Sequence, residues 1–279
     1  MAAVSFASYS PLANVYVPRR RLFGVLALSL VLGCGAGDSQ HRTSETVVLV
    51  HGSFHTPEAT WSLLTKVLDE RRIKWATVDL PSAGPDSPAL ADRTEDVAAA
   101  LAVVEQVAGP VVLVGHSYGG MVISEAGAHP AVTHLVYVCA FAPEPGETLI
   151  ALGASEPPSL LAGAIQFGPG RGLLHVDPAQ ATEVFYADLA PDAAADAVAK
   201  LVPSTASSLL QPATNVAWMD RPTTYVVCEQ DNALSPARER AMAERIGAQI
   251  WSLPTSHSPF LSQPEALADI IESAVRAPD

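Results

Sequence analysis

Short apolar runs and longer amphipathic stretches alternate along most of the chain. Helical patterns cover about 57–71 and about 236–246, and a last one follows residue 260. Such alternation predicts βαβ units, in which right-handed crossover helices cover both faces of a mostly parallel sheet. Each run is apolar at successive positions, which is typical of a strand buried between two helix layers. The runs lie at 46–50, about 74–79, 111–114, 134–139, 223–228 and 249–253.

A glycine-flanked serine follows the third apolar run. Residues 115–119 read Gly-His-Ser-Tyr-Gly, between the run that ends at Val114 and a helical pattern that starts at Gly120. This context predicts a sharp turn that exposes the serine hydroxyl at the strand end, beside the positive end of the helix dipole. Glycine is needed on both sides because a Cβ there would collide as the chain reverses. Ser117 is the candidate nucleophile of a serine hydrolase; the alternative is a plain β-to-α turn.

The loop after the first apolar run is suited to hold an oxyanion. Residues 51–55 read His-Gly-Ser-Phe-His, and Gly52 lets the backbone approach a neighbour closely. A serine nucleophile creates negative charge on the substrate carbonyl oxygen, and preorganised backbone N–H groups must meet that charge. We expect one donor to be Tyr118, the residue after the nucleophile, and the other to be Ser53, with Phe54 as the alternative.

An acid and a histidine follow in the order that a Ser–acid–His triad requires. Asp231 comes shortly after the run 223–228, where a carboxylate can accept from an imidazole and hold its tautomer. His257 follows the last apolar run, from which it can reach the serine as general base. The rival acids are Glu229, Asp220 and Glu144. The histidines have no metal-ligand spacing, so no metal site is predicted.

These four motifs, at residues 51–55, 115–119, 229–231 and 256–260, resemble those of the α/β-hydrolase superfamily. They are most similar to the branch of plant methylesterases and hydroxynitrile lyases, which has many bacterial esterase-like relatives. The resemblance runs from about Thr46 to the C-terminus. It implies the α/β-hydrolase fold, with an eight-stranded, mostly parallel sheet and a helical lid inserted before the strand that carries the catalytic acid. The first β-hairpin of that fold is not evident, and the pattern predicts six strands.

The pattern changes between residues about 142 and 222, where we expect the lid. The stretch 142–146 is rich in proline, and an alanine-rich helical run follows at about 192–201. Two or three short helices and a small strand pair near 172–176 are expected to cover the serine and supply most of an acyl pocket. The candidate pocket residues are Phe54, Phe167, Leu173, Phe185, Tyr186 and Trp218, although ordinary packing would also explain them.

The first 45 residues have a different character. Residues 19–21 are arginines, and an apolar stretch follows from Leu22 to Gly33. A basic region before about twelve apolar residues is typical of an export signal and is short for a bilayer span. The arginines resemble a twin-arginine signal, and residues 31–34 resemble a bacterial lipobox whose Cys34 would be acylated. We expect residues 1–33 to be a signal peptide, 34–45 a flexible tether and 46–279 the hydrolase domain, exported to the periplasm or cell surface; the alternative is an uncleaved hydrophobic tail on a cytoplasmic enzyme.

The composition limits the kinds of partner that the chain is expected to bind. The chain has 279 residues and a net charge of −13, and it has no basic stripe, so nucleic-acid binding is not expected. A membrane surface would be reached only through the N-terminal lipid. Cys139 and Cys228 end neighbouring predicted strands, a placement that rarely gives disulfide geometry. We therefore expect two free, buried thiols.

Together these features predict a serine esterase that cleaves a small or medium, mainly apolar carboxylic ester through an acyl-enzyme, without a cofactor. One alternative is a cofactor-free lyase of the hydroxynitrile lyase type. The plant lyases carry Thr and Lys where this chain has Gly52 and Ser258, and both departures favour ester hydrolysis. The other alternative is a ligand-binding relative that keeps the triad but turns over slowly.

Overall fold

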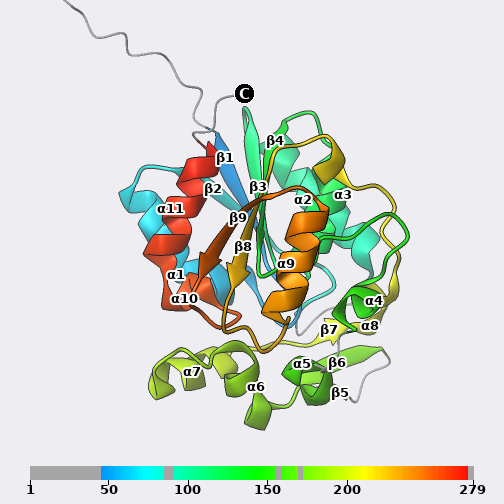
Figure 1. Cartoon of the computed structure of the whole chain (residues 1–279), viewed down its shortest axis with the longest axis vertical. Coiled ribbons are helices and arrows are strands. Elements are labelled where there is room, and N and C mark those ends of the chain that lie inside the picture. The colour runs from blue at the N-terminus through cyan, green and yellow to red at the C-terminus, as the bar shows by residue number, and fades with distance from the viewer. Residues whose placement is uncertain (1–44, 85–90, 155–158, 169–171, 276–279) are drawn as a thin grey trace, which may run out of the picture. The chain divides into compact units, whose positions relative to one another are not determined.

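The computed structural model in Figure 1 describes residues 45–84, 91–154, 159–168 and 172–275. At its centre is a six-stranded sheet in the order β2-β1-β3-β4-β8-β9, in which every neighbouring pair is parallel. The predicted parallel α/β architecture is therefore confirmed, with six strands in the described part of the chain. The strands are β1 (Thr46–Val50), β2 (Lys74–Val78), β3 (Val111–His116), β4 (Val132–Val138), β8 (Thr223–Cys228) and β9 (Gln249–Leu253).

Helices cover both faces of the sheet (Figure 1). Alternate residues of a strand enter different cores: Val48 and Val50 of β1 pack in one, and Val47 and Leu49 pack in the other. The first core includes residues of α2 (Arg93–Gln106), α3 (Gly119–Ala126) and α9 (Pro236–Arg245). The second includes residues of α1 (Pro57–Glu70), α10 (Pro259–Ser262) and α11 (Pro264–Val275). A strand buried in this way must be apolar on both faces.

The expectation that every run is buried on both faces is wrong for the two edge strands, β2 and β9. Both begin exposed and become buried only at their carboxyl ends, and Trp75, Ile250 and Trp251 are exposed. An edge strand has a neighbour on one side only, so part of its surface faces solvent although its sequence is apolar. No helix in the described ranges combines the length and apolar character needed to cross a membrane. The predicted signal peptide, the Cys34 lipidation site and almost all of the tether lie outside the described residues.

Between β4 and β8 the chain leaves the sheet and forms an insert, residues 139–222. Its described residues form five short α-helices, one 3-10 helix and an antiparallel sheet in the order β5-β6-β7, which is one strand more than the predicted pair. Most of these elements lie across the carboxyl ends of the central strands (Figure 1). The elements are α4 (Leu149–Gly153), α5 (Leu160–Ala164), β5 (Ile165–Phe167), β6 (Leu173–Val176), α6 (Pro178–Phe185), α7 (Pro191–Val198), β7 (Ser204–Thr205), α8 (Ala206–Leu210) and η1 (Ala217–Met219).

A disulfide joins Cys139 to Cys228, so the expectation of two free thiols is wrong. Cys228 is the last residue of β8, but Cys139 has already left β4 and has a left-handed φ of 45°. Its N–H donates to the carbonyl of Val226, which brings the two cysteine Cα atoms to 5.6 Å, within the range that disulfides span. The expectation assumed two cysteines on neighbouring strands, whereas Cys139 lies just beyond the end of its strand.

Replacing both cysteines, as Cys139→Ala with Cys228→Ala, is expected to lower the free energy of unfolding by about 2–4 kcal/mol, because the unfolded chain loses a long covalent loop. Denaturant unfolding of the oxidised protein measures this, with Cys34→Ala as the matched control that leaves the bridge intact. Alkylation of unfolded, unreduced protein provides the direct check. Two free thiols at positions 139 and 228 would contradict the bridge.

Candidate active site

The serine of the G-x-S-x-G sequence occupies a sharp turn between β3 and α3. Ser117 has a φ of 52°, a conformation that a residue with a side chain rarely adopts. Its carbonyl accepts from the N–H groups of Gly120 at 3.0 Å and Phe141 at 3.1 Å. A Cβ on Gly115 would lie 2.6 Å from the carbonyl oxygen of Gly119, so only glycine permits this reversal. The whole residue is 8% exposed, which is less than a serine presented at an open strand end would have.

Asp231 and His257 meet in the structure as a hydrogen-bonded pair. The Asp231 Oδ2 accepts from the Nδ1 of His257 at 2.5 Å, and both residues are buried. The other oxygen, Oδ1, accepts from the N–H groups of Ala233 at 2.6 Å and Leu234 at 2.9 Å. Three hydrogen bonds to the two oxygens of a buried carboxyl group fix its direction. An aspartate held in this way fixes the tautomer of the histidine, with Nε2 left as the proton acceptor.

The rival acids lie elsewhere. Glu229 pairs with Arg240, Glu144 lies 3.8 Å from Arg245, and Asp220 is exposed beside the 3-10 helix. None of them has a hydrogen bond to His257 among the contacts of the described residues.

His257 is linked to the serine turn through His116, the residue before Ser117. The His116 Nε2 donates to the backbone carbonyl of His257 at 2.9 Å, and the two rings lie 4.6 Å apart. The structure has no hydrogen bond from the Ser117 hydroxyl to the imidazole. His116 therefore packs between the turn and the candidate base.

The loop after β1 packs directly on the serine. A Cβ on Gly52 would lie 2.9 Å from the Cβ of Ser117. Neither Ser53 nor Tyr118 uses its N–H in a hydrogen bond to another described residue, whereas the N–H of Phe54 donates to the Ser204 hydroxyl at 2.9 Å. Of the two alternatives for the donor from this loop, Ser53 and Phe54, Ser53 therefore has the free N–H group.

Tyr118 is anchored by an acid that the sequence did not single out. Its hydroxyl donates to the Asp96 Oδ2 at 2.5 Å, and the Asp96 Oδ1 accepts from the N–H of Ser82 at 2.9 Å. Burial raises the pKa of Asp96, and it raises the pKa of Tyr118 well above its ordinary value. In the sequence Asp96 resembles any acid in the first turn of a helix, so no local signal marks it.

Three histidines besides His257 are buried around the turn. Burial lowers the pKa of His51 to about 4 and that of His55 to about 3, and it holds the pKa of His116 well below its ordinary value. These groups are neutral at physiological pH and act as hydrogen-bonding members of the packing. The His55 Nε2 lies 2.9 Å from the Tyr186 hydroxyl and thereby joins the loop to the insert.

Two clusters of potential metal ligands lie near the site, and both contain Cys139. One adds Asp231 and His257, and the other adds Cys228 and Glu239. Metals bind the cysteine thiolate, but here the Cys139 sulfur is bonded to that of Cys228. These clusters therefore do not fit a metal ion in the oxidised protein.

A cavity of about 510 Å³ is lined by residues of the insert and by Ala233, which follows β8. Two of its lining residues also contact the site: the N–H of Phe141 donates to the Ser117 carbonyl, and that of Ala233 donates to Asp231. None of the lining side chains is charged. The lining residues are Phe141, Leu149, Ile150, Gly153, Ala154, Ser159, Leu161, Ala162, Ile165, Phe167, Leu174, Ala206, Leu209, Leu210 and Ala233.

Of the predicted pocket residues, the structure brings only Phe167 to this cavity. Phe185 and Tyr186 pack around His55, with ring centroids 5.4 and 6.2 Å away, and the Phe185 ring also lies 5.7 Å from that of His257. Phe54 is buried in the core, and the indole N–H of Trp218 donates to the carbonyl of Pro143 at 2.8 Å. Leu173 is half-buried in β6.

Residues 47–270 match the alpha/beta hydrolase family, so the chain belongs to that family. The family, together with the similar proteins described next, supports hydrolase activity on a small-molecule substrate. It also confirms the superfamily that the four motifs indicated.

Three similar proteins cover most of the chain. An alpha/beta hydrolase (nvfD) from Aspergillus novofumigatus is 28% identical over 242 residues, which are 82% of this chain and 95% of that protein. The crystal structure of a pyrethroid hydrolase from Sphingobium faniae JZ-2 has a TM-score of 0.72 and 24% identity, with 84% of this chain and 98% of that one covered. A methylesterase from Arabidopsis has a TM-score of 0.68 and 23% identity, over 83% and 98% of the two chains. The two structures show a shared fold.

The contact between Gly52 and Ser117 leads to a prediction about turnover. Gly52→Ala would place a methyl group 2.9 Å from the Ser117 Cβ, so the loop or the serine must move. We expect hydrolysis of a p-nitrophenyl ester to fall roughly 100-fold, the effect of misplacing a reacting group by about 1 Å. Gly163→Ala in α5 is the matched control, since nothing lies within 4 Å of its added Cβ. Equal turnover of the two variants would show that the loop does not pack against the nucleophile.

The buried histidines predict acid sensitivity. The His51 Nε2 accepts from the N–H of Leu80 at 3.2 Å, which a protonated ring cannot do. Its folded pKa of about 4 lies below the ordinary 6.5, so the unfolded chain binds more protons between these values. Stability is therefore expected to be full above pH 6.5 and to fall as the pH drops toward 4, by up to about 3 kcal/mol for this histidine. Urea unfolding between pH 4 and pH 6.5 measures this loss. If the free energy of unfolding of His51→Gln fell with pH as steeply as that of the wild type, His51 would not be its source.

Proposed function

We propose that the chain is a serine esterase whose catalytic triad is Ser117, His257 and Asp231. The observation that carries the proposal is the buried Asp231–His257 pair, with its 2.5 Å hydrogen bond, held by His116 beside a serine in a strained turn. A structural role alone would not explain why a buried, hydrogen-bonded Asp–His pair and a left-handed serine come together at the carboxyl end of a parallel sheet.

In the proposed mechanism the Nε2 of His257 takes the proton of the Ser117 hydroxyl as the serine oxygen bonds to the ester carbonyl carbon. The carbonyl π electrons move to oxygen, and the N–H groups of Ser53 and Tyr118 hold that oxyanion. When the carbonyl re-forms, the bond to the alcohol oxygen breaks and His257 protonates the leaving alcohol. Water then repeats the sequence on the acyl-enzyme and releases the acid. Asp231 keeps the imidazole oriented throughout.

The cavity supports an apolar substrate. Its volume of about 510 Å³ is within the range of ligand pockets, and its lining offers no charge to pair with an anionic or cationic substrate. We propose that the insert acts as a lid and that the apolar part of the ester occupies this cavity, with the carbonyl at Ser117. This space suits a medium-sized group better than an acetyl group.

The disulfide supports a location outside the cytoplasm. Disulfides persist mainly in oxidising compartments, and the Cys139–Cys228 bridge lies in the folded domain itself. This agrees with export, for which the N-terminal residues supply the proposed signal.

The proposed chemistry is tested with a fluorophosphonate probe on the full-length protein. We expect a single adduct on Ser117, found by mass spectrometry, and a loss of ester turnover of roughly 10⁴-fold or more in Ser117→Ala. Ser273→Ala, at an exposed position of α11, is the matched control and should label and turn over normally. In a p-nitrophenyl ester series, kcat/KM should rise from acetate to medium acyl chains and be low for a charged acyl group. Normal turnover of Ser117→Ala would contradict the mechanism.

A further inference from the structure

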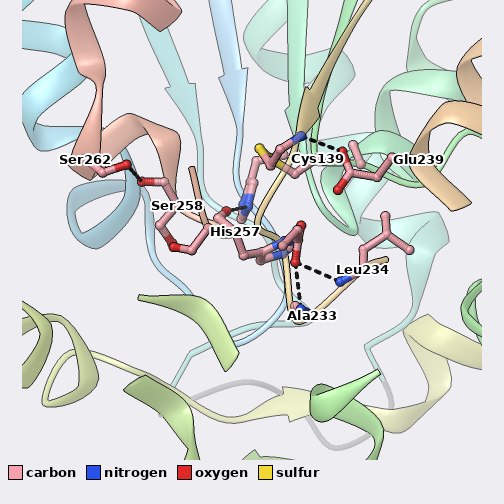
Figure 2. The surroundings of a disulfide bond; sticks show 12 residues. Cys139, Ala233, Leu234, Glu239, His257, Ser258 and Ser262 are labelled. Carbon is pink, nitrogen blue, oxygen red and sulfur yellow. Dashed lines mark hydrogen bonds and ion pairs between the residues drawn. A yellow bond between two sulfur atoms is a disulfide. The ribbon is translucent and has the colours of Figure 1, made fainter. Parts of the chain in front are cut away.

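Glu239 of α9 is a fully buried acid whose burial the mechanism does not explain. One carboxyl oxygen, Oε2, accepts from the N–H of Cys228 at 3.0 Å, a contact drawn in Figure 2. No donor among the described residues reaches the other, Oε1, and the group with which the Glu239 carboxyl interacts is the Asp231 carboxyl. No Lys, Arg or His within the described ranges forms an ion pair with Glu239. A glutamate is rarely buried without a partner, because its charged form loses the solvation of water.

Its surroundings are acidic or neutral on every side. Asp231 and the cysteine bridge lie next to it, and an oxygen of each acid lies within 4.8 Å of the Cys139 sulfur. Glu229, at the end of β8, adds negative charge and is itself paired with Arg240. Tyr225, which faces Glu239 from β8, donates its hydroxyl to the carbonyl of Ala140 and is not free to donate to the acid.

The two carboxyl groups cannot both carry charge at low cost. Asp231 already accepts three hydrogen bonds, two of them on Oδ1 and one on Oδ2. Glu239 has one donor, and burial together with the charge of Asp231 raises its pKa well above the ordinary value. The proton therefore resides on the glutamate.

We infer that Glu239 is a neutral carboxylic acid that supports the Asp231–His257 pair from behind, as a positioning residue rather than a catalytic one. The kinetic test of this inference rests on the proposed function, because it measures ester hydrolysis. In the neutral form one oxygen accepts from Cys228 while the other carries a proton that can be shared with Asp231. This sharing disperses the negative charge of Asp231 and limits how strongly the pair holds a proton on His257. An ionised Glu239 would do the opposite.

Two substitutions of similar size separate these possibilities. Glu239→Gln keeps an acceptor for Cys228 and a donor for Asp231, and it is neutral like the proposed acid. Glu239→Leu keeps the volume but has neither group. Glu244→Gln and Glu244→Leu, at an exposed position of the same helix, are the matched controls.

The readout is the pH profile of kcat/KM, whose acid limb reports the protonation of the general base. Glu239→Gln is expected to keep the acid limb of the wild-type enzyme. Glu239→Leu should move that limb to higher pH and lower kcat/KM about tenfold, since a buried donor to the aspartate is lost. If Glu239 were ionised, Glu239→Gln would remove a negative charge and move the limb to lower pH, which would overturn the inference. A Leu variant with the wild-type profile would overturn it too.

Infrared difference spectroscopy supplies a measurement that does not depend on turnover. At neutral pH the wild-type protein should show a protonated-carboxyl band that Glu239→Gln lacks and Glu244→Gln keeps. Absence of that band difference would overturn the inference even in an active enzyme. Its presence in a protein that cleaves no ester would count against the proposed function and leave the protonation state established. If Glu239→Leu does not fold, the pH profile of Glu239→Gln and the infrared band still test the inference.

Discussion

The backbone reversal at Ser117 is the constraint on which the site depends. With φ at 52°, the chain passes from β3 into α3 so tightly that Gly115 and Gly119 lie in backbone contact. The same reversal receives the loop after β1 at Gly52, and its carbonyl accepts from Phe141 after β4. Three strand ends are therefore fixed relative to one another by contacts that allow no added methyl group. The cost of a left-handed serine is offset by the packing that surrounds it.

Charge in this site is concentrated on very few groups. Burial keeps the nearby histidines His51, His55 and His116 neutral, and Tyr118 remains a phenol that donates to Asp96. Against this background the three donors to Asp231 define where negative charge is stable. In a medium with little water such placement has more effect than the net charge of −13 spread over the molecule. Polarity near Ser117 is thus provided mainly by oriented neutral groups, which need little reorganisation during a reaction.

Much of the architecture could be predicted because a strand buried on both faces has a continuous run of apolar residues, which is visible in the sequence. The runs at 46–50 and 223–228 coincide with β1 and β8, and the position of Asp231 followed from the end of such a run. Features that depend on packing between segments far apart in the sequence have no such local pattern. Cys139 reads as a strand residue although it leaves the strand, and Glu239 reads as a surface acid between two arginines although β8 covers it. The change of pattern at about 142–222 coincides with the insert, but its sequence does not indicate which side chains line the cavity, because short helices can turn several faces inward.

The disulfide also changes how the insert is joined to the rest of the molecule. The bridge spans 89 positions, from the end of β4 to the end of β8, and encloses the entire insert in a covalent ring. A peptide bond broken anywhere in that ring would leave one molecule rather than two fragments. The sheet on both sides of the cut would stay connected through sulfur. The insert can therefore be cut by proteolysis without separating Ser117 from Asp231 and His257, which lie on opposite sides of it in the sequence.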